Sequence, residues 1–273
     1  MRLNMRRKGW NIMLCKEIMR VIEATYPTTA ALDFDNVGLL AGRAGKEVNR
    51  VYLALDATDA VIDRALEAGA DMLITHHPLI FSPLKKINDE DFISRRILKL
   101  IRNDISYYAM HTNYDVLGMA ELSEKILGIR DTEVLDETME DTEGNKEGIG
   151  RVGTLESPMT LEECCVYVKH KLNLGSIKVF GDMDKKVQRL AVSPGSGKTA
   201  IAAALKKGAD VLVTGDIGHH DGIDAVEQGL SVIDAGHYGT EYIFIDDMKR
   251  FLNEKLPVLE VMTEPVIHPF QVI

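Results

Sequence analysis

Two adjacent histidines, His76 and His77, are the residues best suited to metal chemistry. They follow the apolar segment 72–74 and precede Pro78, which restricts the local backbone. Neighbouring residues at a strand end point in different directions, so one ion would not easily take both imidazoles. Two ions a few ångströms apart could take one imidazole each, with a carboxylate holding the pair together.

A second set of candidate ligands lies further along the chain. His237 and Glu241 are four residues apart, a spacing that places both side chains on one face of a helix. His111 and Asp115 have the same spacing. Glu241 is therefore the candidate bridge between two ions, and Asp115 is a further oxygen ligand. Imidazole and carboxylate suit zinc, iron, manganese and nickel alike, and without cysteine they favour an open, hydrolytic site.

Other histidines offer roles beside the metal. His111 is another ligand, a group close to the ligands, or a histidine hydrogen-bonded below the site. His219 and His220 either line the site and transfer protons or are polar residues at a helix start. The glycine-rich segment 195–199 resembles a phosphate-binding loop, but Val192 stands where that loop needs its first glycine. A strand-to-helix turn is the simpler interpretation, and an anion contact stays an alternative.

Alternating apolar strands and amphipathic helices must position these residues. Their order predicts an α/β fold with mainly parallel sheets flanked by helices. At a constant offset of 139 residues, segment 69–75 aligns with 208–214, which indicates two similar halves. Ligands of such sheets bind at the carboxyl ends of the strands, where all the candidates lie. We therefore expect two similar α/β lobes with the metal site at the interface between them.

The expected organisation has four parts. Residues 1–12 are a disordered arm or a misassigned start, and 13–128 form the first α/β lobe. Residues 129–150 are an acidic connection, and 151–273 form the second lobe. The lobes pack intimately, as two domains or as one.

Composition limits the partners. A formal net charge of −10 argues against a surface built for nucleic acid. No apolar run approaches the length that crosses a bilayer, so we expect no membrane association. Three cysteines without a C-x-x-C motif favour a reducing compartment, and hence a cytoplasmic location.

Several motifs, in this order along the chain, resemble those of the GTP cyclohydrolase 1 type 2 family, the Nif-three-like dinuclear-metal proteins. The resemblance runs from about residue 13 to the C-terminus, and the connection at 131–150 matches the short form without an inserted domain. The motifs are LDFDNVGL (32–39), THHPLIF (75–81), HTNYD (111–115), SGK (196–198) and TGD (214–216) followed by DAGHYGTE (234–241).

The resemblance implies a two-lobed subunit in a toroidal homohexamer, with two divalent metal ions per subunit. It implies a GTP cyclohydrolase-like hydrolase in which metal-activated water attacks a nucleotide or purine-like small molecule. Our own candidate for the catalytic acid-base group is His111 or His220. The alternative is a non-enzymatic, ring-shaped metal-binding adaptor or regulator that binds a protein or single-stranded nucleic acid. Matched residue by residue, the family's metal ligands fall on His76, His77, Asp115, His237 and Glu241.

Overall fold

The computed structural model describes residues 13–141 and 143–273, so the expected arm at 1–12 lies outside the described residues. The chain forms two units, each built from separate segments. It passes into the second unit at Thr112, earlier than the expected boundary at 128, because Leu127 belongs to the hydrophobic core of that unit. Unit 1 contains the residues up to Pro27, Asn36–His111 and Ile245–Glu264, and unit 2 contains Thr28–Asp35, Thr112–Phe244 and Pro265–Ile273.

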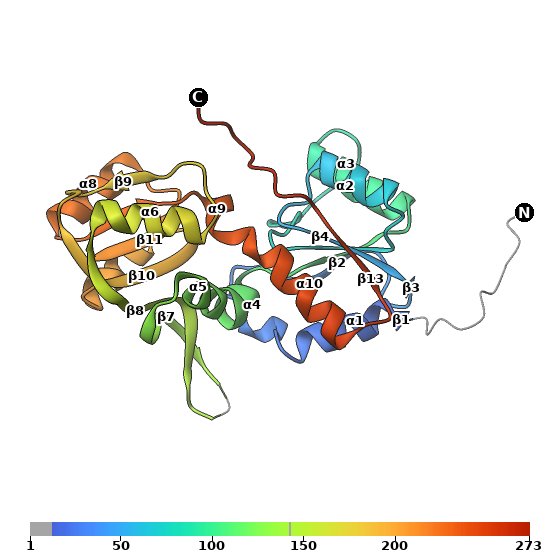
Figure 1. The fold of residues 1–273 in the computed structure, drawn as a ribbon. Helices are drawn as coiled ribbons and strands as arrows, with labels where there is room; N and C mark the ends of the chain where they lie inside the picture. The colour runs from blue at the N-terminus through green and yellow to red at the C-terminus, as the bar shows by residue number, and fades with distance from the viewer. Residues whose placement is uncertain (1–12, 142) are drawn as a thin grey trace, which may run out of the picture. The chain divides into compact units, whose positions relative to one another are not determined.

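Unit 1 is a five-stranded sheet with helices on both faces. Its strand order is β13-β4-β5-β6-β2, parallel except for the antiparallel edge strand β2. Helices α2 and α3 lie on one face, and α1 and α10 on the other (Figure 1). The strands are β2 Gly38–Ala41, β4 Arg50–Ala54, β5 Met72–Thr75, β6 Ser106–Ala109 and β13 Glu260–Thr263, with the short pair β1 Met13–Leu14 and β3 Glu47–Val48 beside them, and the helices are α1 Cys15–Glu23, α2 Asp59–Glu67, α3 Phe92–Arg102 and α10 Ile243–Lys255.

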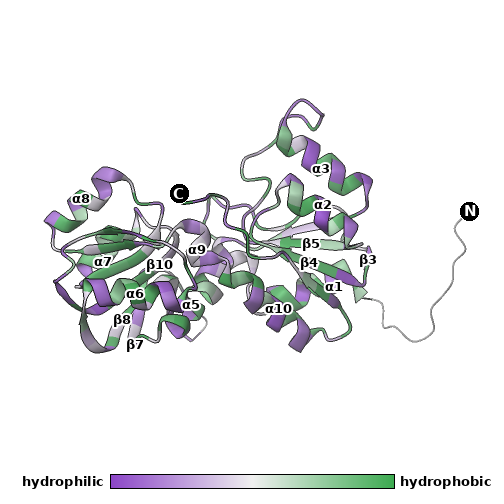
Figure 2. Cartoon of the chain, turned by 45° about the horizontal axis from the view of Figure 1, so that its top comes forward, coloured by the Kyte–Doolittle hydropathy of each residue, from purple (hydrophilic) through white to green (hydrophobic). Residues whose placement is uncertain are grey.

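Local sequence explains these elements. The central strands read as apolar bands in Figure 2, and every residue of β5 is buried, as expected of a parallel strand covered on both sides. Helix α3 begins at Phe92, because the carboxylate of Asp91 accepts the backbone N–H of Ser94 at 3.0 Å and caps the helix there. Ile97 and Leu100 then face the sheet.

Unit 2 is a six-stranded sheet in the order β7-β8-β10-β11-β12-β9. Strands β10, β11 and β12 are parallel, and the flanking strands are antiparallel. The strands are β7 Arg130–Glu140, β8 Lys146–Thr160, β9 Lys178–Phe180, β10 Lys186–Ser196, β11 Val211–Gly215 and β12 Ser231–Asp234. The helical segments are η1 Thr28–Ala30, α4 Thr112–Tyr114, the π-helical η2 Asp115–Met119, α5 Ala120–Leu127, α6 Leu161–Lys171, α7 Ala200–Lys206, α8 His219–Glu227 and α9 His237–Glu241.

The acidic segment 129–150 is more than a connection. Most of it forms the antiparallel hairpin of β7 and β8, which reaches beyond the rest of the sheet (Figure 1). Gly148 lets the strands close, since a Cβ there would lie 1.9 Å from the carbonyl oxygen of Asp136. The acidic composition reflects an exposed edge strand whose one buried side chain is Leu135.

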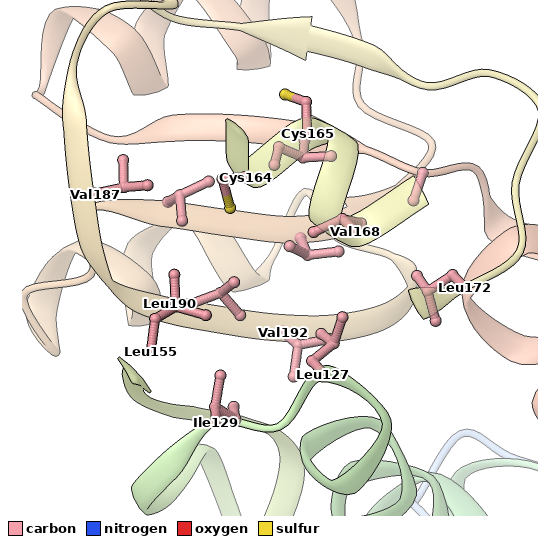
Figure 3. Packing of buried hydrophobic residues seen from close by; sticks show 14 of the residues in the cluster. Leu127, Ile129, Leu155, Cys164, Cys165, Val168, Leu172, Val187, Leu190 and Val192 are labelled. Carbon is pink, nitrogen blue, oxygen red and sulfur yellow. The ribbon is translucent and has the colours of Figure 1, made fainter. Parts of the chain in front are cut away.

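The core of unit 2 packs α6 against β10, as Figure 3 shows for Cys164, Val168 and Leu190. The chain's cysteines are free and buried, as expected of small core side chains. Within the described ranges, no helix combines the length and the apolar character needed to span a membrane.

The internal repeat predicted from the sequence is confirmed by matching hydrogen bonds. In unit 1 the carboxylate of Asp71 accepts two successive backbone N–H groups, at 2.8 and 3.1 Å. In unit 2 Asp210, which is 139 residues further on, does the same at 2.9 and 2.8 Å. The α/β fold of two similar, helix-flanked units is therefore confirmed. The donors are Asn49 and Arg50 in unit 1 and Gln188 and Arg189 in unit 2.

Candidate metal centre

Three imidazoles converge at the carboxyl ends of two neighbouring strands in unit 1. His76 and His77 directly follow β5, and His111 follows β6 by two residues. The ring centroid of His76 lies 5.0 Å from that of His77 and 5.3 Å from that of His111. One nitrogen of each ring lies within 4.8 Å of the other two, so the three could serve one metal ion with little movement.

Hydrogen bonds fix two of these rings. Nδ1 of His76 lies 2.8 Å from the carbonyl oxygen of Met110, and since a carbonyl can only accept, Nδ1 carries the proton. Nδ1 of His77 lies 2.8 Å from a carboxylate oxygen of Asp56. The His77 backbone N–H also donates to the carbonyl of Leu55 at 2.9 Å. For both histidines the nitrogen that would bind a metal is therefore Nε2.

Unit 2 brings together the remaining candidate ligands. His237 is the first residue of α9 and Glu241 the last, so the predicted helical spacing is confirmed. Nε2 of His237 lies 3.1 Å from a carboxylate oxygen of Glu241, which is almost fully buried. A carboxylate oxygen of Asp115 lies within 4.8 Å of one of Glu241. Asp115 opens the π-helical turn, a distortion that often accompanies functional sites.

Carboxylates dominate the electrostatics around His237. Its Nδ1 lies 2.8 Å from a carboxylate oxygen of Asp216. Burial lowers the pKa of His237, but the neighbouring carboxylates of Glu241 and Asp216 outweigh it and raise the pKa to about 9. Without a metal, His237 is therefore protonated at neutral pH, and a bound cation would take the place of that proton.

Glycines make room for the two unit 2 ligands. A Cβ at Gly195 would lie 2.3 Å from Oε1 of Glu241, and one at Gly215 would lie 2.4 Å from the backbone nitrogen of His237. The N–H of Gly195 also donates to the hydroxyl of Thr240 at 2.9 Å, which ties the end of β10 to α9. The glycine-rich segment 195–199 thus contains the end of β10 and the turn into α7, and it also borders the candidate ligands.

His219 and His220 begin α8 and are exposed. Their ring centroids lie 5.2 Å apart, and both residues lie in the first turn of this helix. An acid-base role for His220 stays a prediction.

Sequence reasoning missed Asp56 as an orienting residue, and it noted Asp216 only as part of a motif. Asp216 directly follows β11 and Asp56 follows β4 by two residues, and this place at a strand end is the signal that could have found them. Their contacts with histidines 21 residues away are not visible in any local spacing.

A cavity of about 490 Å³ adjoins α9 in unit 2. The C-terminal segment forms one wall and is held by the hydroxyl of Tyr238, which accepts the N–H of Ile267 at 3.0 Å. His268, whose ring lies 5.1 Å from that of Tyr238, belongs to this wall. The lining residues are Leu174, Gly175, Ser176, Ala235, Gly239, His268, Phe270 and Val272.

Several known proteins are similar to this chain in sequence and in fold. A sequence model of the family described as Duf34/NIF3 (NGG1p interacting factor 3) matches residues 13–268. A Clostridium acetobutylicum protein named GTP cyclohydrolase 1 type 2 homolog is 38% identical over 251 residues, which cover 91% of this chain and 92% of that protein. Among solved structures, a Bacillus cereus protein related to NIF3 is 28% identical with a TM-score of 0.88, covering 96% of this chain and 99% of the other. Reduced HcgD from Methanocaldococcus jannaschii is 32% identical with a TM-score of 0.81, covering 93% of this chain and 99% of the other.

Proposed function

This chain belongs to the Duf34/NIF3 family, and from that premise we propose that it is a metal-dependent hydrolase with two divalent ions per subunit. The observation that carries the proposal is the clustering of imidazole and carboxylate groups at strand ends in each unit. Such nitrogen and oxygen donors fit zinc, iron, manganese or nickel. When bound, ions of this kind supply the Lewis-acid chemistry that activates water for hydrolysis.

We assign five ligands. His76 and Asp115 would hold one ion, His77 and His237 would hold the other, and Glu241 would be the ligand shared by both. The near-complete burial of His76 and Glu241 supports this assignment, because buried imidazole and carboxylate groups need strong partners.

His111 is the proposed acid-base group. Its ring lies 5.3 and 5.7 Å from those of His76 and His77, and it is partly exposed, so it can exchange protons with solvent or substrate. His220 is the second candidate for this role.

The proposed substrate is a nucleotide or a purine-like ring. The name GTP cyclohydrolase 1 type 2 homolog, carried by the Clostridium acetobutylicum relative, supports this class. The cavity beside α9 supports it too, since Phe270 and His268 offer flat side chains for a heteroaromatic ring. A toroidal homohexamer and a cytoplasmic location complete the proposal.

Metal content is the first test. We expect close to two equivalents per subunit in protein purified without chelator, measured by elemental analysis. His77→Ala and Glu241→Gln should lower this content, and the exposed His170→Ala is the matched control. Unchanged occupancy in Glu241→Gln would refute the bridging role.

Turnover is the second test. Metal-loaded protein should release formate from GTP or phosphate from esters, and a chelator should abolish the reaction. No metal uptake on titration of the folded protein would overturn the hydrolase proposal. It would favour the adaptor alternative, to be pursued with salt-dependent binding to single-stranded nucleic acid.

A further inference from the structure

Resting on the proposed function, we propose that Asp56 and Asp216 are positioning residues. They hold His77 and His237 in the one tautomer that directs Nε2 at the metal ions. Neither carboxylate is assigned as a ligand, and each acts through the histidine that it contacts.

In unit 1 two adjacent residues after β4 hydrogen-bond to the backbone and to the side chain of His77. Asp56 follows β4, and its carboxylate lies 2.8 Å from Nδ1 of His77. The carbonyl of the preceding residue, Leu55, accepts the His77 N–H at 2.9 Å. Two bonds from adjacent residues leave the imidazole little freedom to turn. An ionised carboxylate only accepts, so it keeps the proton on Nδ1.

In unit 2 the same contact is made from a strained backbone. Asp216 lies 2.8 Å from Nδ1 of His237, and it has a φ of 56°, the left-handed region that costs a residue with a side chain about 1 kcal/mol. More than half of the Asp216 side chain is exposed, so burial of this residue does not repay that strain. The conformation does bring the carboxylate to the ring of a proposed ligand.

A carboxylate suits this role better than a neutral acceptor. It raises the basicity of the imidazole, and it adds negative charge near the ions. The two carboxylate ligands and the two positioning carboxylates together carry four negative charges, which matches two divalent cations. His76 differs, because its Nδ1 donates to the backbone carbonyl of Met110.

The test uses Asp56→Asn and Asp216→Asn in the full chain, with the exposed Asp184→Asn as the matched control. Zinc affinity is measured by competition with a chelator dye. We expect each Asn variant to bind zinc about 10- to 100-fold more weakly, while the urea midpoint of Asp56→Asn in excess chelator stays at the wild-type value. Long-range ¹H–¹⁵N spectra of histidine-labelled, zinc-loaded protein should show a single Nδ1–H form at His77 and His237. Each Asn variant should show mixed forms at its own histidine.

Asp216→Gly separates positioning from backbone strain. It relieves the left-handed conformation, so it should lose zinc affinity as Asp216→Asn does, without the cost of backbone strain. Wild-type affinity and unmixed spectra in the Asp variants would overturn the inference and leave the proposed function intact. If wild-type protein binds no zinc or other divalent ion, the proposed function itself fails.

Discussion

Strand β5 of unit 1 is followed by two histidines, whereas β11 of unit 2, at the same place in the repeat, ends in Gly215 and is followed by Asp216. The backbone hydrogen bonds at the residue just before each of these positions are the same in both units. Met110 donates its N–H to the carbonyl of Thr75, and Ala235 donates to that of Thr214. The two units therefore share a scaffold and differ in the residues at its functional edge.

Packing explains why unit 2 cannot carry the histidine pair. By the constant offset, Gly215 corresponds to His76. A Cβ at 215 would lie 2.4 Å from the backbone nitrogen of His237 and 2.8 Å from the carbonyl oxygen of Gly195. The candidate histidine ligand of unit 2, His237, therefore follows the next strand, β12, and not β11. The following position holds an imidazole in unit 1, His77, and an orienting carboxylate in unit 2, Asp216.

The largest expected effect tests this explanation. In Gly215→Ala the new methyl group meets backbone atoms that cannot swing away, so we expect the free energy of unfolding to fall by about 3 kcal/mol. Urea unfolding followed by circular dichroism measures it. Gly45→Ala is the control, because a Cβ there meets nothing within 4 Å, and it should stay within about 0.5 kcal/mol of wild type. A fully stable Gly215→Ala would show that packing is not what keeps a side chain out of this position.

The shared scaffold predicts an intermediate and equal effect. Asp71→Ala and Asp210→Ala each remove an acceptor of two backbone N–H groups, so each should lower stability by about 1–3 kcal/mol. Hydrogen exchange should accelerate at 49–50 in the first variant and at 188–189 in the second. Stability losses that differ several-fold between the two variants would contradict the equivalence of the units. Asp184→Ala is the control for the loss of a surface charge.

The repeat and the ligand spacing could be predicted from sequence because both are local. Strand lengths fix which residues follow β5, and a helix fixes how His237 meets Glu241. Strand pairing aligns His111 with Gly236, one position before His237. That shift depends on where β6 and β12 end, which composition does not reveal.

The other misses depend on contacts between distant segments. The hairpin of β7 and β8 was hidden because the outward side of an edge strand carries charges, as a loop does. Asp56 orients His77 from a neighbouring strand, and no spacing along the chain links the two residues.

The smallest expected effect concerns the difference between His76, which faces a backbone carbonyl, and His237, which two carboxylates flank. In metal-free protein the raised pKa of His237 means that the protonated form is favoured by folding. Its contribution to stability is complete below the ordinary value of 6.5 and is lost as the pH rises through about 9. We expect the free energy of unfolding to fall by about 1 kcal/mol over this window, a value reduced by solvent screening because about a third of the side chain is exposed.

Urea midpoints in chelator from pH 6 to pH 10 measure this loss, and His237→Asn should flatten the curve of stability against pH. An equally steep curve in that variant would assign the pH dependence to other groups and remove this electrostatic distinction between the two histidines.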